Sequence, residues 1–243
     1  MLSRIKAFLV HVAVSAFIGL ITLWLVFFAW YPAPLEQALG VTQIFLLLLI
    51  VDIILGPCLT FLVFKPGKKK LVFDLAIICL FQVSALGYGI WAVFSARPAW
   101  LVFNVDRFDV VQAVDIDARK IDEAWPEFRT ASWFSPRWVG AIQPEVSEQR
   151  QAVMFEAILY GSDIAHRPNL YRPLSSFSEQ IKKKAMSLEK LRSFNNEEAV
   201  RKKLASWPEA KYWVPLKARE KSMVVLLTED ASVLGIAELN PWD

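Results

Sequence analysis

The loop that follows Gly161 holds the one group of side chains whose types could carry out nucleophilic and acid-base chemistry. Ser162, Asp163 and His166 provide a hydroxyl, a carboxylate and an imidazole within a few residues. These are the residue types of a hydrolytic triad, but a triad is defined by its geometry and not by proximity in sequence. Three groups in one short loop do not easily reach that geometry, so a turn that closes a helix at Gly161 is the favoured interpretation.

The sequence has none of the compact motifs that bind phosphates or catalytic metals. It lacks a glycine-rich phosphate loop, His-Glu-x-x-His and Gly-x-Ser-x-Gly. Its two cysteines, Cys58 and Cys79, lie in apolar runs and lack the spacing of metal ligands. We therefore expect a protein that is not an enzyme and that uses neither a cofactor nor a metal.

Polar side chains inside the apolar runs form a second group of interest. Thr22, Asp52 and Gln82 come from three different runs, and a helical rise of about 1.5 Å per residue places them at one level. An ionised carboxylate at that depth costs at least about 2.5 kcal/mol. Two hypotheses stay open: the three side chains lock the helices together by hydrogen bonds, or Asp52 accepts a polar group or a proton from a partner.

Gly56 and Pro57 follow Asp52 by about one helical turn. Proline removes a backbone hydrogen bond and crowds the carbonyl group of Ile53, so a kink is expected there. Kinked helices beside an acid occur in transporters, but three helices enclose no pathway on their own. His11 lies close to the boundary of its run and is expected too far from Asp52 to relay protons.

These residues must be positioned by three long helices. Apolar runs of membrane-spanning length cover about residues 8–30, 41–64 and 72–94, and none has a polar stripe. The first run is too long for a signal peptide and has no small-residue cleavage site, so it is expected to be a retained anchor. The sequence thus predicts a transmembrane domain over residues 1–96.

Basic residues predict the direction in which these helices run. Arg4 and Lys6 precede the first run, whereas the short loop at 31–40 has no basic residue. The loop between the second and third runs contains four lysines: Lys65, Lys68, Lys69 and Lys70. Because positive loops stay inside, we expect a cytoplasmic N-terminus and an extracytoplasmic domain over residues 97–243, which is periplasmic in a Gram-negative cell. Aromatic rings are expected at the outer boundary: Trp30, Tyr31, Trp91 and Trp100.

Charge and composition argue against a nucleic-acid partner. The chain has 243 residues, of which 55% are hydrophobic, and a net charge of +3. Residues 97–243 contain 21 basic and 21 acidic side chains, so the positive excess belongs to the apolar part. No basic face remains from which to argue for binding to DNA or RNA.

The order of strand-like and helical segments in residues 97–243 predicts an α+β domain with a mainly antiparallel sheet. Strand-like segments are expected at 100–105, 108–113, 138–142, 211–218, 223–228 and 233–239. One helix is expected from Pro144 to Gly161, and two more lie within 176–207. Capping patterns open these last two: Ser176 with Glu179, and Asn195 with Glu198.

Several segments together resemble the type IV pilin accessory proteins, the TfpX/TfpZ family. The resemblance extends over nearly the whole chain and rests on short stretches. They include Arg4 to Leu9, Gly40 to Thr42, Phe45 to Leu48, Val51-Asp52, Leu55 to Pro57, Val63 to Lys69, Phe73 to Leu75, Ala96 to Pro98, Val105 to Phe108, Val214 to Arg219 and Leu239 to Trp242. It implies a non-enzymatic protein of the bacterial inner membrane that assists the stability or assembly of a cognate pilin, and it carries no active site.

Two hypotheses of function follow, beside a third in which the protein is an enzyme that acts on the pilin or on a lipid-linked sugar, which the missing motifs weaken. In the first, the helices hold the transmembrane helix of a type IV pilin, the major pilin, and the outer domain contacts its head, with other pilus-assembly membrane proteins as further partners. In the alternative, the protein is a membrane sensor whose periplasmic domain signals through a cytoplasmic partner docked on Lys65 to Lys70. The second reading is weakened by the small cytoplasmic portion, which leaves no room for an output domain.

Overall fold

The structure, a computed structural model, describes residues 2–144, 151, 155, 156 and 161–242. The chain forms two compact units. The helix unit comprises Met1–Ala29 and Gly40–Ser95, and the sheet unit comprises Trp30–Leu39 and Ala96–Asp243. The helix predicted between Pro144 and Gly161 lies almost entirely outside the described residues.

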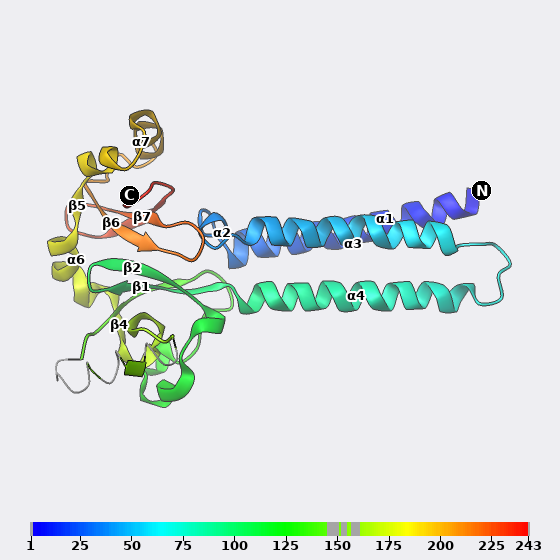
Figure 1. Ribbon diagram of the computed structural model, residues 1–243, viewed down its shortest axis with the longest axis horizontal. Helices are drawn as coiled ribbons and strands as arrows, with labels where there is room; N and C mark the ends of the chain where they lie inside the picture. Colours follow the sequence, from blue (N-terminus) through cyan, green and yellow to red (C-terminus); the bar gives the residue numbers. More distant parts are fainter. Residues whose placement is uncertain (1, 145–150, 152–154, 157–160, 243) are drawn as a thin grey trace. The chain divides into compact units, whose positions relative to one another are not determined.

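The helix unit consists of three long apolar helices. They are α1 (Leu2–Trp24), which continues through a π-helical turn at Leu25–Trp30, α3 (Val41–Val63) and α4 (Leu71–Ser95). In the described chain, three helices are long and apolar enough to cross a membrane: Ser3–Trp30, Val41–Val63 and Leu71–Ser95. The three predicted apolar helices are therefore confirmed, and α3 packs against both α1 and α4 (Figure 1).

Glycines bring these helices close together. A Cβ atom on Gly89 of α4 would lie 1.8 Å from Leu48 Cδ1 of α3, and one on Gly19 of α1 would lie 3.1 Å from Ile53 Cδ1. Helices in lipid gain little from the hydrophobic effect, so they associate by such close packing and by a few hydrogen bonds. The glycines thus set the spacing at which polar side chains of neighbouring helices can meet.

The sheet unit is built on an eight-stranded sheet in the described residues. Its strands are β1 (Pro98–Asn104), β2 (Arg107–Gln112), β3 (Arg137–Ala141), β4 (Tyr171–Pro173), β5 (Met186–Ser187), β6 (Tyr212–Lys217), β7 (Met223–Leu227) and β8 (Val233–Ala237). The order is β4-β3-β1-β2-β6-β7-β8, with β5 paired to β6. The pairs β1–β3 and β2–β6 are parallel and the others antiparallel, so the mainly antiparallel prediction is confirmed for a sheet that is in detail mixed.

Short helices cover this sheet: α2 (Leu35–Ala38), α6 (Ser178–Lys184) and α7 (Glu197–Leu204). The cap predicted at Ser176 is wrong, because that residue lies inside a 3₁₀ turn that leads directly into α6. The cap predicted at Asn195 moves by one residue. Asn196 accepts a hydrogen bond from the backbone nitrogen of Glu198 at 2.9 Å, whereas Asn195 Oδ1 accepts one from the backbone nitrogen of Asn240 at 2.7 Å.

The loop between the first two long helices belongs to the sheet unit. Leu35 and Ala38 are buried in the same apolar cluster as the central strands. The carbonyl oxygen of Ala38 accepts hydrogen bonds from the backbone nitrogens of Glu220 and Lys221, at 3.0 and 3.1 Å. Residues 30–39 are therefore an integral part of the sheet unit, although they lie between two spans in sequence.

Three of the four rings expected at the outer boundary of the membrane are buried within the protein. Trp30, Tyr31 and Trp100 are all buried, and only 1% of the surface of Tyr31 is exposed. Burial raises the pKa of the Tyr31 phenol above its ordinary value. Trp91, on α4, is exposed. Of the four rings, only that of Trp91 is exposed to its surroundings, and the level of the four along the membrane normal stays a prediction.

Candidate functional site

The polar cluster of the helix unit is centred on Gln82 of α4. Its Nε2 atom donates to the backbone carbonyl oxygen of Asp52, on α3, at 2.9 Å and to the carboxylate Oδ1 of the same residue at 3.1 Å. In the described part of the chain, Gln82 Oε1 is buried and has no hydrogen-bond partner. Among the described residues, the Asp52 carboxylate accepts one hydrogen bond, at Oδ1, so its Oδ2 atom is open to a further donor.

Gly56 and Pro57 lie beside this cluster in α3. The helix runs through Pro57 from Val41 to Val63, so the proline is accommodated within a continuous helix. Gly56 faces the amide group of Gln82, and the missing side chain leaves the space that the amide occupies. The sequence Asp52 to Pro57 therefore provides both the acceptors and the room for one side chain of α4.

The residue of α1 that lies nearest to Asp52 and Gln82 is not the one predicted from its level along the helix. The hydroxyl of Thr22 donates to the carbonyl oxygen of Gly19 in its own helix at 3.0 Å. Ser15 instead faces the cluster, with its Oγ atom 3.5 Å from Gln82 Nε2. Both are buried residues of α1, about two helical turns apart, and Ser15 is the one that lies beside the amide. His11 is elsewhere, with Nδ1 2.7 Å from Thr60 Oγ1.

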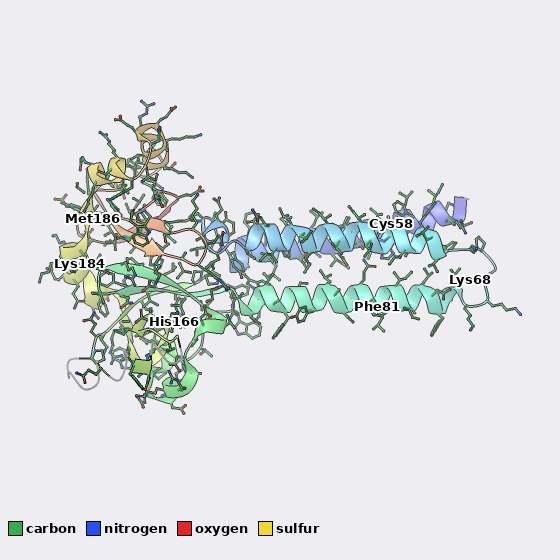
Figure 2. The ribbon with its side chains drawn as sticks, in the orientation of Figure 1. Cys58, Lys68, Phe81, His166, Lys184 and Met186 are labelled. Atoms are coloured by element: carbon green, nitrogen blue, oxygen red, sulfur yellow. The ribbon has the colours of Figure 1, made fainter. Side chains whose placement is uncertain are left out.

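Basic residues gather at one end of the helix unit. The Nε atom of Arg4, near the start of α1, donates to the carbonyl oxygen of Phe64, just after α3. The loop that follows contains Lys65, Lys68, Lys69 and Lys70, and Figure 2 shows Lys68 in this loop. Lys68 forms an ion pair of 2.6 Å with Asp74 in the first turn of α4. The positive charges at 4–6 and 65–70 therefore share one end of the unit.

The loop of Ser162, Asp163 and His166 has no triad geometry. Ser162 Oγ donates to Asp117 Oδ2 at 2.7 Å, and His166 Nδ1 accepts from the backbone nitrogen of Asp163 at 3.1 Å. The Asp163 carboxylate accepts from the backbone nitrogen of Ile164 at 2.7 Å, and Asp163 and His166 form a capping box. In Figure 2 His166 lies in the sheet unit. These bonds organise a short 3₁₀ turn, in which Ser162 is bonded to Asp117 and not to His166.

A cleft of about 810 Å³ lies between this loop and β2. Asp117 lines this cleft, and its carboxylate accepts two hydrogen bonds from the Arg119 guanidinium, at 2.8 and 2.5 Å. The Arg119 bonds, supported by Ser162, hold the pKa of Asp117 well below its ordinary value of 3.8 despite partial burial. Among the described residues no group of three His, Cys, Asp or Glu side chains could hold a metal ion. Charged and polar side chains line much of the cleft, and the charges of Asp117 and Arg119 are paired with each other.

Comparison with known proteins places the chain in a family. Two proteins from Dichelobacter nodosus, named fimbrial assembly protein of serogroup I and of serogroup E1, are each 30% identical to it over 244 residues. These matches cover 96% of this chain and 94% of each relative. The chain belongs to the fimbrial assembly protein family.

Shorter matches agree with this assignment to the fimbrial assembly family. The family model described as fimbrial assembly protein FimB matches residues 1–40. The fimbrial assembly protein of serogroups C1 and C2 from Dichelobacter nodosus is 32% identical over 117 residues, which cover 47% of this chain and 89% of that relative. No solved structure matches the chain. The predicted resemblance to pilus accessory proteins is thereby confirmed.

Proposed function

We propose that this member of the fimbrial assembly family is a non-enzymatic accessory protein of the inner membrane that assists the assembly of a type IV pilus. Its partner is the pilin subunit, whose apolar helix lies in the bilayer before assembly. The helix unit holds that helix, and the sheet unit contacts the pilin head. Other membrane proteins of pilus assembly are further partners.

The distribution of charge supports the proposed orientation. Arg4 and the four lysines of the loop at 65–70 share one end of the helix unit. Because positively charged segments are retained in the cytoplasm, this end is the cytoplasmic one. The chain then crosses the membrane three times and the residues after Arg97 lie in the periplasm. A pilin has the same division between membrane and periplasm, so both units can contact it at once.

The observation that carries the proposal is the incomplete polar cluster at Asp52. A half-buried carboxyl group lies midway along an apolar helix, and Gln82 satisfies one of its two side-chain oxygens. A polar group in lipid is costly unless it finds a partner, and such groups join helices by hydrogen bonds. A second helix that brings a donor to Asp52 Oδ2 would complete the cluster. We assign this place to the pilin helix.

The proposal is tested by co-purifying the pilin with the tagged full-length protein from cells that express both. Asp52→Leu removes the acceptor and is expected to lower pilin recovery at least fivefold, while the level of the tagged protein stays the same. Asp52→Asn keeps the Oδ1 acceptor of Gln82 and replaces Oδ2 by a donor, so it is expected to lower recovery while leaving the bond between α3 and α4 in place. Asp74→Asn, which changes an acid at the basic end of the same unit, is the matched control.

Two results would contradict the proposed contact. Undiminished recovery of pilin with Asp52→Leu would remove Asp52 from the pilin site. Equal losses with Asp52→Leu and Asp74→Asn would mean that the helix unit as a whole is damaged, so the specific role of the cluster would be lost. Thr22→Ala, which changes a hydroxyl bonded within its own helix, should leave recovery unaltered.

A further inference from the structure

Exposed apolar side chains gather where the sheet unit begins. Trp133, Phe134 and Val114 are 72%, 61% and 63% exposed. They lie on two separate loops of the sheet unit, and each loop is fixed to the residues that directly follow α4. We call these three residues the exit patch.

Arg97 holds the first of these loops. The guanidinium of Arg97 donates to the carbonyl oxygen of Ser132 from Nε at 3.1 Å and from Nη2 at 2.8 Å. Ser132 directly precedes Trp133 and Phe134, and its Oγ accepts a hydrogen bond from the Phe134 nitrogen at 3.1 Å. Because Arg97 is itself buried, its side chain is a fixed support and not a mobile surface group. The two exposed rings are therefore presented from an anchored backbone.

The same short segment holds the second loop. The backbone nitrogen of Ala113 donates to the carbonyl oxygen of Arg97 at 2.9 Å, and the Gln112 amide donates to the carbonyl oxygen of Ala96. Val114 follows directly. Both loops of the exit patch are thus tied to residues 96–97, two residues or fewer beyond the end of α4 at Ser95.

Covalent geometry limits how far Arg97, which anchors both loops of the exit patch, can lie from the end of α4. The Cα atoms of Ser95 and Arg97 are at most about 7 to 8 Å apart, whatever direction the chain takes after α4. The headgroup region is roughly 5 to 7 Å thick on each side of the hydrocarbon. The last turns of α4 carry the exposed rings of Tyr88 and Trp91, a composition typical of a membrane interface. Arg97, to which both loops are bonded, therefore lies about one headgroup layer beyond the end of α4.

We propose that Val114, Trp133 and Phe134 insert into the lipid headgroup region and hold the sheet unit against the outer surface of the bilayer. Tryptophan is favoured at this level because its ring is apolar and its N–H is polar. Large apolar side chains exposed together mark an interaction surface, and continuity with a membrane span identifies lipid as what covers it. This contact depends on the three spans and not on the proposed binding of pilin.

Spin labels placed in the full-length protein in phosphatidylcholine–phosphatidylglycerol vesicles test the insertion. Cys58 and Cys79 are first replaced by alanine, and single cysteines are then introduced as Trp133→Cys, Phe134→Cys and Val114→Cys. Val105→Cys is the matched control, because Val105 is 47% exposed and lies at the far end of β1, about 25 Å along the strand from Arg97. We expect the ratio of oxygen to nickel-chelate accessibility to be at least threefold higher at the exit patch than at position 105.

An equal ratio at all four positions would overturn the proposal. Low accessibility of the exit patch to both reagents would also overturn it, because it would mean that protein, such as a second copy or the pilin head, covers these side chains. A second measurement keeps Trp133 in place. The difference in fluorescence between the wild type and Trp133→Phe is the emission of Trp133. We expect lipids brominated near the headgroup to quench this emission more than lipids brominated near the end of the acyl chain. Equal quenching by the two lipids would count against insertion.

Discussion

Gly56 of α3 lies directly opposite the side-chain amide of Gln82 of α4. A Cβ atom at position 56 would lie 2.1 Å from both Cδ and Oε1 of that side chain. The amide could move aside, but it would then lose its two hydrogen bonds to Asp52. Gly56 therefore leaves the space in which the Gln82 amide forms the hydrogen bonds that join α4 to α3.

The first prediction is that Gly56→Ala destabilises the helix unit by about 1 to 3 kcal/mol, the usual cost of an added methyl in a packed contact. The measurement is unfolding of the full-length protein in mixed micelles by added dodecyl sulfate. Gly87→Ala, on α4, is the control, since a Cβ atom there meets nothing within 4 Å. Equal stability of the two variants would show that the amide relocates without loss.

The second prediction concerns Gly140 of β3, where a Cβ atom would lie 2.2 Å from the ring of Phe177. A buried ring cannot swing aside as an amide can, so Gly140→Ala should destabilise the sheet unit by about 1 to 3 kcal/mol. Thermal unfolding followed by near-ultraviolet circular dichroism measures the loss. The double variant Gly140→Ala/Phe177→Leu should recover part of it, and strictly additive losses would contradict a direct clash.

Much of this fold could be predicted because its signals are local. Continuous apolar runs identified the three long helices, and strand-length apolar segments identified the strands from β1 to β3 and from β6 to β8. β4 and β5, with three and two residues, are too short to leave a pattern. The parallel pairs β1–β3 and β2–β6 arise from contacts between distant segments, which no local signal carries.

The polar cluster of the helix unit could be predicted only as far as it depends on the level of each residue along its helix. Counting residues from the boundary placed Asp52 and Gln82 at one level, and the structure joins them by hydrogen bonds. The count selected Thr22, but Ser15, about two helical turns nearer the start of α1, is the residue that lies beside Gln82, so the level along the helix does not identify the contact. Nor did any pattern place residues 30–39 in the sheet unit, since that depends on the core into which Leu35 fits.

The third prediction concerns the turn between β1 and β2. Val105 has a φ of 64°, a left-handed conformation that costs a residue with a Cβ atom about 1 to 2 kcal/mol and a β-branched residue more. Val105→Asn should stabilise the sheet unit by about 1 kcal/mol, because asparagine tolerates this region. Thermal unfolding measures the gain. Val105→Ile keeps the branched side chain and should leave the midpoint unchanged, and a similar gain in both variants would exclude backbone strain as the cause.

The fourth prediction separates a structural role of His166 from a catalytic one. The imidazole accepts a hydrogen bond from Asp163 within one turn, and Ser162 is bonded to Asp117. His166→Ala should therefore cost about 1 kcal/mol in stability, as the loss of a cap does, and leave the number of pili per cell unchanged in electron micrographs. Loss of pili at a normal protein level, reproduced by Ser162→Ala, would instead point to chemistry in this loop.

The fifth prediction follows from the lowered pKa of Asp117. Arg119 and Ser162 stabilise the ionised carboxylate in the folded protein, so the unfolded chain takes up a proton more readily near pH 3.8. The stabilisation is therefore fully present above that pH and is lost as the pH falls through the lower pKa of the folded state. Asp117→Asn should be less stable than the wild type by about 1 kcal/mol at pH 7, since hydrogen bonds to a partly exposed charge are worth about that much.

The difference between Asp117→Asn and the wild type should shrink as the pH is lowered from 5 to 3, because the carboxyl of the unfolded wild-type chain then takes up a proton while that of the folded protein stays ionised. Thermal midpoints of the full-length protein in detergent, measured across this range, provide the test. Asp122→Asn, at an exposed position in the same segment, should follow the wild type at every pH. A destabilisation by Asp117→Asn that is the same at pH 3 and pH 7 would mean that the shape of the side chain, and not its charge, holds the loop of Ser162 in place.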